Sequence, residues 1–165
     1  MLVIQRPSVE AIGTASNNRQ KFSIGPLDPG LGHTIGNSLR RMLLSSIPGA
    51  AISTVKFESA LHEFDTIEGI TEDVTEIILN LKDVVVMSEG DEPVVITVDV
   101  KGPADVTAAD IVCPTGVTIL NPSQHIATLS AKGRLVVDIT VERGKGYASS
   151  DRDTRKVIGV IPIDA

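Results

Sequence analysis

Residues 30–49 read GLGHTIGNSLRRMLLSSIPG, and this stretch carries the strongest local pattern in the chain. Within it, large apolar side chains recur at the three- and four-residue spacing of one helix face: Ile35, Leu39, Met42, Leu43 and Ile47. The spacing predicts an amphipathic helix over residues 34–47. Thr34 has the side chain of an N-cap residue, and Pro48-Gly49 is expected to end the helix.

A second helix is predicted over about residues 72–85. Val74, Ile77, Ile78 and Leu81 form its apolar stripe. This helix lies in an acidic stretch, since residues 58–92 contain eleven acidic side chains and one basic side chain, Lys82. Such an excess indicates either a solvated face or a surface that meets a partner of opposite charge.

The remaining apolar segments are short and rich in β-branched residues, which is typical of strands. The predicted strands cover residues 21–24, 51–58, 94–100, 135–142 and 157–163. In the first long strand Ser53, Val55 and Phe57 are expected to share one face. In the strand at 135–142 the side chains expected to point inward are Leu135, Val137, Ile139 and Val141. Two helices occur among these strands, but helices and strands do not alternate strictly along the chain. This order predicts an α+β fold.

The composition excludes several classes of protein. The chain has 165 residues, a net charge of −6 and 2% aromatic residues, which argues against binding nucleic acid by bulk charge or by base stacking. One cysteine, Cys113, excludes an internal disulfide framework and fits a reducing compartment. The longest uncharged run, residues 111–131, contains Pro114 and Pro122 and is not expected to span a membrane.

No motif of an autonomous enzyme is present in the sequence. A phosphate-binding loop, a nucleophile elbow and a zinc-binding helix motif are all missing. His33, His62 and His125 lie far apart in the sequence, which favours structural or surface roles over a metal site. We therefore expect no catalytic residue, no cofactor site and no metal site in this chain.

Residues 30–49 closely resemble the N-terminal domain of the bacterial RNA polymerase α subunit. Four further segments resemble the same family and occur in the family's order: LHEF at 61–64, GITEDVTEIILNLK at 69–82, VTAADI at 106–111 and VERGKGY at 141–147. Together these segments cover nearly the whole chain.

This resemblance implies an α+β architecture in which a dimerisation subdomain is interrupted by a β-rich insert subdomain. The first part of the dimerisation subdomain would be residues 1–48, the insert 49–162, and residues 163–165 the start of the return. It also implies a non-catalytic subunit of DNA-directed RNA polymerase that homodimerises and recruits the β and β′ subunits. The alternative is a small adaptor of the same fold outside the polymerase. The expected location is the cytoplasm, on the nucleoid as part of the polymerase.

The resemblance also implies residue roles. Arg41 and Leu44 would contact the β subunit, while Lys82 and Ile163 would contact the large subunits. Solvated surface side chains are the alternative for Arg41 and Lys82. The apolar residues of the first helix would form the dimer seam or the subdomain core, and the sequence does not separate these roles: Ile35, Leu39, Met42, Leu43 and Ile47. The segment 143–147 resembles a family loop without an assigned partner.

The chain departs from the family in one major way. It ends at Ala165, where the family chain continues. We therefore expect a fragment or truncated product that lacks the rest of the dimerisation subdomain and the C-terminal DNA-binding domain. Direct DNA binding and membrane binding are not expected of it.

Overall fold

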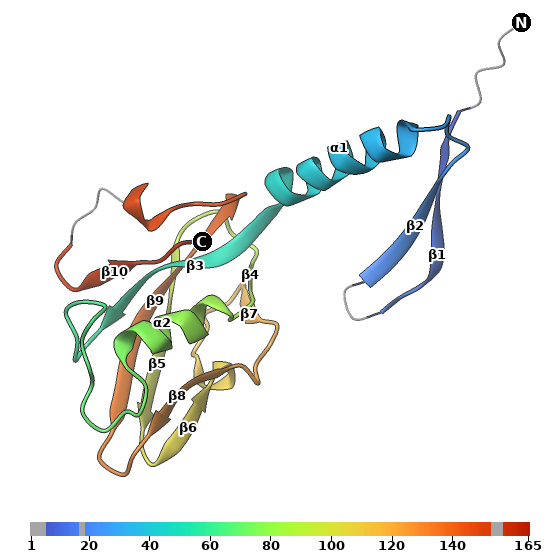
Figure 1. The fold of residues 1–165 in the computed structure, drawn as a ribbon. Helices are drawn as coiled ribbons and strands as arrows, with labels where there is room; N and C mark the ends of the chain where they lie inside the picture. Colours follow the sequence, from blue (N-terminus) through green and yellow to red (C-terminus); the bar gives the residue numbers. More distant parts are fainter. Residues whose placement is uncertain (1–5, 17–18, 153–156) are drawn as a thin grey trace, which may run out of the picture. The chain divides into compact units, whose positions relative to one another are not determined.

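The computed structural model of the chain describes residues 6–16, 19–152 and 157–165, with only the backbone described for Arg152. It has the predicted α+β composition (Figure 1). The chain divides into two compact units, residues 1–44 and 45–165. In chain order the helices and strands are β1 (Ser8–Ser16), β2 (Arg19–Gly25), α1 (Leu31–Ser46), β3 (Pro48–Phe57), α2 (Val74–Lys82), β4 (Val86–Ser88), β5 (Val94–Lys101), β6 (Ala104–Thr107), β7 (Val117–Ile119), β8 (His125–Leu129), β9 (Arg134–Lys145) and β10 (Val160–Pro162).

The first unit consists of an antiparallel hairpin and most of α1. Strands β1 and β2 pair from Ser8↔Gly25 to Ser16↔Arg19, so β2 is longer than the predicted strand and β1 was not predicted. Polar and apolar residues do not alternate regularly in β1, which explains why its sequence did not predict a strand.

Helix α1 begins three residues earlier than predicted. Leu31 donates its N–H to the carbonyl of Asp28 at 3.1 Å, and Thr34 lies inside the helix, where its carbonyl accepts the Ser38 hydroxyl at 2.9 Å. The prediction of Thr34 as N-cap was therefore wrong. The predicted end is confirmed, because α1 stops at Ser46 and Pro48 opens β3. No side chain of α1 is buried.

The second unit is built on a four-stranded antiparallel sheet with the order β10-β3-β9-β5. Strand β9 is central and pairs with both β3 and β5, so it holds the sheet together. Its predicted inward residues are confirmed, since all four are buried: Leu135, Val137, Ile139 and Val141.

Strand β3 corrects one detail of the prediction. Val55 and Phe57 are buried as predicted, but Ser53 is not, and its two neighbours in the strand, Ile52 and Thr54, are buried instead. The pairing with β9 shifts by one residue between Ile52 and Thr54, which marks a β-bulge. A bulge inserts one residue into a strand and changes which side chains face the core.

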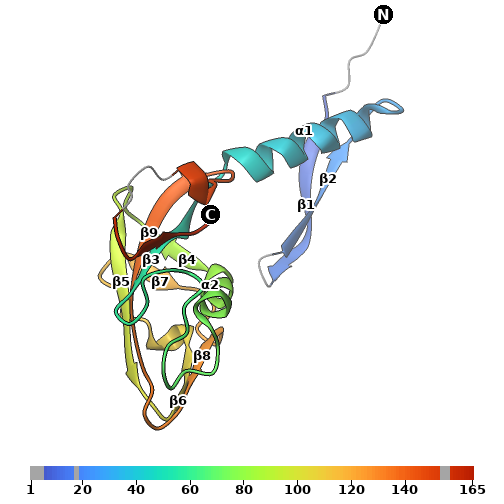
Figure 2. The ribbon, with the colours of Figure 1, turned by 60° about the vertical axis from the view of Figure 1, so that its left-hand side comes forward.

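Helix α2 lies against one face of this sheet (Figures 1 and 2). It begins after Asp73, whose carboxylate accepts the N–H of Glu76 at 2.7 Å, and it ends at Lys82. It is therefore shorter at both ends than predicted. Its buried side chains, Val74, Ile77 and Leu81, belong to the same apolar cluster as the inner face of the sheet.

Two small antiparallel sheets, β4–β7 and β6–β8, complete the second unit. The carboxylate of Glu72, just before α2, accepts three hydrogen bonds from β8. They come from the Thr128 N–H at 2.7 Å, the Thr128 hydroxyl at 3.0 Å and the His125 ring at 3.0 Å. This carboxylate therefore joins the start of α2 to β8.

Candidate functional site

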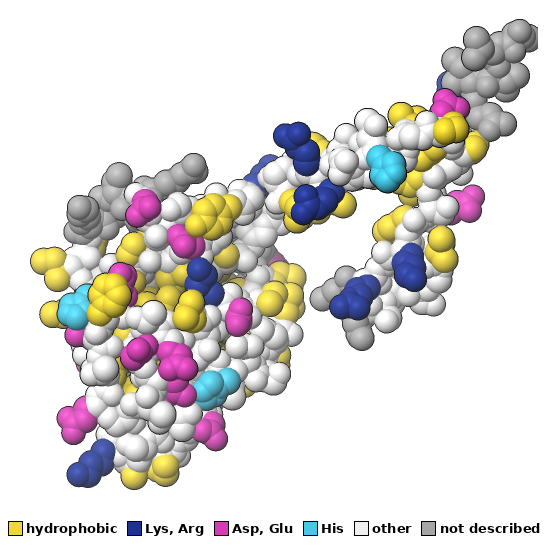
Figure 3. Space-filling model, viewed as in Figure 1, with side chains coloured by type: hydrophobic (Ala, Val, Ile, Leu, Met, Phe, Trp, Pro, Cys, Tyr) yellow, Lys and Arg dark blue, Asp and Glu magenta, His cyan; other side chains and the backbone are white. Residues whose placement is uncertain are grey.

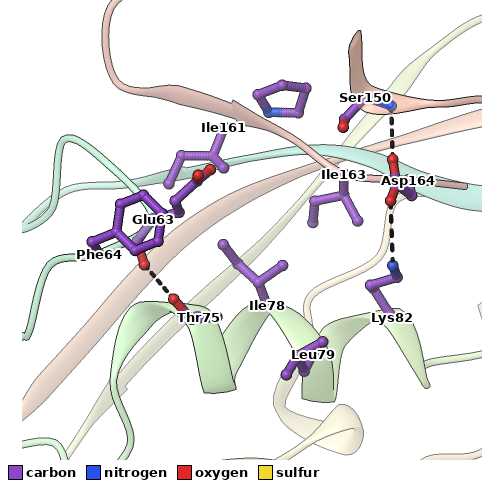
Figure 4. Close-up of a pocket in the computed structure, with 11 residues that line it drawn as sticks. Glu63, Phe64, Thr75, Ile78, Leu79, Lys82, Ser150, Ile161, Ile163 and Asp164 are labelled. Carbon is purple, nitrogen blue, oxygen red and sulfur yellow. Dashed lines mark hydrogen bonds and ion pairs between the residues drawn. The ribbon is translucent and has the colours of Figure 1, made fainter.

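A groove of about 190 Å³ lies between α2 and β10 in the second unit (Figure 4). Its centre is apolar, and charged side chains lie at both ends. The lining residues come from the loop before α2, from α2, from Ser150 and from β10 and the residues after it: Glu63, Phe64, Thr75, Ile78, Leu79, Lys82, Ser150, Ile161, Pro162, Ile163 and Asp164.

The groove brings together two of the residues predicted to act in one interface, Lys82 and Ile163, which are 81 positions apart in the sequence. Ile163 is held by its backbone, since its N–H donates to the carbonyl of Ser53 at 2.8 Å. Its side chain is largely buried, so only a small part of it is available to a ligand. Lys82 is the last residue of α2 and is 38% exposed.

Asp164 links Lys82 to the segment around Ser150. One carboxylate oxygen lies 4.0 Å from the Lys82 Nζ, and the other accepts the Ser150 N–H at 2.8 Å. The Ser150 backbone and hydroxyl, together with the Lys82 charge and the Tyr147 hydroxyl, hold the pKa of Asp164 below its ordinary value. Asp164 is therefore charged at neutral pH, and this end of the groove carries a compensated pair of charges.

The other end of the groove is formed by a tightly held loop over residues 61–65. The Asp65 carboxylate accepts the N–H groups of Leu61 at 2.9 Å and His62 at 3.3 Å. The same carboxylate lies 3.1 Å from the His62 ring. The loop is fastened to α2 because Val74 donates its N–H to the Asp65 carbonyl at 3.2 Å and Thr75 donates its hydroxyl to the Glu63 carbonyl at 2.7 Å.

Helix α1 carries the other predicted site residues. Arg41 and Leu44 are both exposed and lie three residues apart, which places them on the same side of the helix. Of the five residues predicted for the dimer seam or the subdomain core, Ile35 is half-buried and the other four are exposed: Leu39, Met42, Leu43 and Ile47. The helix thus presents a wide apolar surface.

The other polar side chains considered in the sequence form no reactive cluster in the described part of the chain. His33 is exposed, His62 pairs with Asp65 and His125 with Glu72. No group of three or more His, Cys, Asp or Glu among the described residues is placed to hold a metal ion. Burial raises the pKa of the Cys113 thiol, which disfavours a nucleophilic thiolate. Among the described helices, none is long and apolar enough to cross a membrane.

Sequence reasoning singled out Lys82 but not the other residues at the two ends of the groove. Glu63 and Phe64 lie in the segment 61–64 that carried part of the family resemblance, but no role followed for them. Asp164 lies beside Ile163 and was also passed over. These side chains sit in loops or at a strand end, where no periodic pattern marks them.

Comparison with known proteins gives a consistent picture. Residues 55–165 match the family model described as the RNA polymerase Rpb3/RpoA insert domain. The chain is 54% identical over 167 residues to the DNA-directed RNA polymerase subunit alpha of Saccharopolyspora erythraea, covering 100% of this chain and 46% of that protein. It is also 54% identical over 169 residues to the subunit of the same name from Beutenbergia cavernae, covering 100% of this chain and 49% of that protein. The chain thus spans about half the length of the relatives it matches.

Proposed function

The chain belongs to the family of DNA-directed RNA polymerase alpha subunits, and on that premise we propose that it is an assembly scaffold of the bacterial enzyme. In this role it homodimerises and recruits the β and β′ subunits for DNA-templated transcription. It supplies no active-site residue of its own. Its place is the cytoplasm, on the nucleoid as part of the polymerase.

The observation that carries the proposal is the uncovered apolar surface of α1. The helix has 16 residues and no buried side chain. A helix of this length is only marginally stable in water without packing. Contiguous apolar surface on a soluble protein is typical of an interface, and burying each large side chain contributes about 1.5–3 kcal/mol. A second copy of the chain, packed on Leu39, Met42, Leu43 and Ile47, would supply this cover.

Arg41 and Leu44 are proposed to contact the β subunit. An exposed arginine beside an exposed aliphatic side chain is a common composition of interface hot spots. The guanidinium group can bind a carboxylate through two hydrogen bonds, and the leucine adds apolar area next to it. The remaining apolar residues of α1, including Ile35, would then serve the dimer and the subdomain core.

Lys82 and Ile163 are proposed to belong to the surface on which a large subunit docks. Their presence in one groove supports this role, because neither the helix nor the strand alone would bring them together. The apolar centre of the groove offers contact area, and the charged ends offer orientation.

We also propose the domain organisation that the resemblance implied. Residues 1–48 form the first part of a dimerisation subdomain, 49–162 form the insert and 163–165 begin the return. Residues 1–5 and 17–18 of the first part and 153–156 of the insert lie outside the described residues. Two observations support this organisation. The boundary between the two compact units lies between Leu44 and Ser45, and Pro48 is the first residue of β3, the first strand of the four-stranded sheet.

Co-expression of the tagged chain with the β and β′ subunits tests the proposal. We expect the chain to recover both subunits, with two copies of the chain in the recovered complex. Arg41→Ala should cost about 2–5 kcal/mol of binding free energy to β, because it leaves a buried partner group unpaired. Less β should therefore be recovered, while the dimer persists. The matched control is Arg40→Ala, the neighbouring exposed arginine on a different side of the helix.

Recovery of neither large subunit by the wild-type chain would contradict the scaffold role. Recovery of a different set of proteins would favour the adaptor outside the polymerase. Equal recovery of β by the wild type, Arg41→Ala and Arg40→Ala would contradict the assignment of Arg41 alone.

A further inference from the structure

The chain keeps most of its few aromatic side chains on the surface. It contains three Phe, one Tyr and no Trp. Only Phe57 is buried, while Phe22, Phe64 and Tyr147 are exposed. Phe64 has the highest exposure of the four, at 80%, and it lines the groove between α2 and β10. Exposed aromatic side chains at a concave surface are enriched in protein interfaces.

The backbone at Phe64 is also held in place before any partner binds. The loop 61–65 is closed by the Asp65 carboxylate and fastened to α2 on both sides of Phe64, through Thr75 to the Glu63 carbonyl and through Val74 to the Asp65 carbonyl. A partner that contacts Phe64 therefore has little loop entropy to remove. Such preorganisation favours affinity.

The charges of the groove are unequal at its two ends. Figure 4 shows Lys82 and Asp164 together at one end, and Glu63 with Phe64 at the other. Among the described residues no ion pair involves the Glu63 carboxylate, and the surrounding surface around α2 is rich in acidic side chains (Figure 3). This end of the groove therefore carries an uncompensated negative charge that suits a cationic group.

Backbone pairing offers little to a ligand here. Strand β10 is the edge of the four-stranded sheet, and Ile163 next to it donates its N–H inward to Ser53. Because successive N–H groups of a strand alternate in direction, the preceding N–H would point away from β3 to the open edge, and that residue is Pro162, which has none. A docking segment must be recognised by its side chains rather than by adding a strand.

From these observations we propose that Phe64 and Glu63 are the recognition pair of the groove. Phe64 anchors an apolar side chain of the docking segment, and Glu63 binds a lysine or arginine next to it. This inference rests on the proposed function, because the docking segment that occupies the groove belongs to a large subunit of the polymerase. Thr75 and Asp65 act as positioning residues.

The test uses the full chain co-assembled with the large subunits. Phe64→Ala should weaken recovery of the docking subunit by about tenfold or more, the size expected for an interface hot spot. Glu63→Lys should weaken it at low salt, and the difference from wild type should shrink as salt rises, because an ion pair at the surface is screened. The thermal midpoint of both variants should stay at the wild-type value, since both side chains are exposed.

Two variants outside the groove serve as controls. Leu120→Ala removes an exposed apolar side chain just after β7, and Asp105→Lys reverses an exposed charge on β6. Both should bind like wild type. If Phe64→Ala and Glu63→Lys bind as their controls do while the wild type recovers both large subunits, the recognition pair is wrong and the scaffold role stands. If the wild type recovers neither subunit, the scaffold role fails and this inference fails with it.

Discussion

Replacing Glu72 by glutamine should destabilise the second unit, because this carboxylate joins α2 to β8. It accepts three hydrogen bonds, and its side chain is only 11% exposed. Burial alone would raise the pKa of Glu72, but the bonds from Thr128 and His125 outweigh it and leave the pKa below its ordinary value of 4.5. The folded chain therefore favours the charged form.

The expected loss in the free energy of unfolding for Glu72→Gln is about 1–3 kcal/mol at pH 7, the range for losing hydrogen bonds to a charged group. With a urea slope of about 2 kcal/mol per molar, the midpoint should fall by about 0.5–1.5 M. Because the folded-state pKa is lowered, this contribution is fully present above pH 4.5 and is lost as the pH falls through the lower folded value.

Urea unfolding followed by far-UV circular dichroism, at several pH values from 7 down to about 3.5, measures both effects. The difference between wild type and Glu72→Gln should shrink over the acidic part of this range. Glu68→Gln, which changes an exposed carboxylate in the same segment, is the matched control and should unfold like wild type. An unchanged midpoint for Glu72→Gln at pH 7 would refute the reasoning, as would a difference that stays constant with pH.

Three further outcomes are expected. Gly133→Ala should lower the unfolding free energy by about 1–3 kcal/mol, since an added Cβ would overlap the Gly69 carbonyl, whereas Gly144→Ala meets open space and should be nearly neutral in urea unfolding. In hydrogen exchange on the chain alone, amides of residues 38–44 should exchange much faster than those of 136–141, because α1 buries no side chain and β9 is the centre of the sheet; equal protection would contradict this. With its net charge of −6, the chain should show no mobility shift with duplex DNA at physiological salt.

The elements that sequence patterns predicted well are those in which local pattern and tertiary packing agree. Strand β9 alternates strictly over its buried length, and its inward face follows the prediction. Helix α2 was found from its apolar stripe, although its ends were placed too far out. Its last turn was misjudged because Val84 is buried like a helix residue but lies in the connection to β4.

The elements that were missed are short or irregular. Strands β4, β6, β7 and β8 have three to five residues each and are separated by turns, so no period could be recognised. The bulge in β3 leaves no mark in the local sequence, because it is defined by pairing with β9 far along the chain. The groove is likewise a product of tertiary structure, and its exposed residues, Glu63 and Phe64, follow no hydrophobic pattern.

The central position of β9 has a consequence for synthesis of the chain. Both β3 and β5 pair with β9, and the partners of β3 are made about 80 residues after it, as in Phe57↔Val137. At a translation rate of about 5–20 residues per second, β3 waits roughly 4–16 seconds on the ribosome before it can pair. During that time Ile52, Val55 and Phe57 have no partner strand to cover them, so this stretch is where a chaperone would be expected to bind the nascent chain.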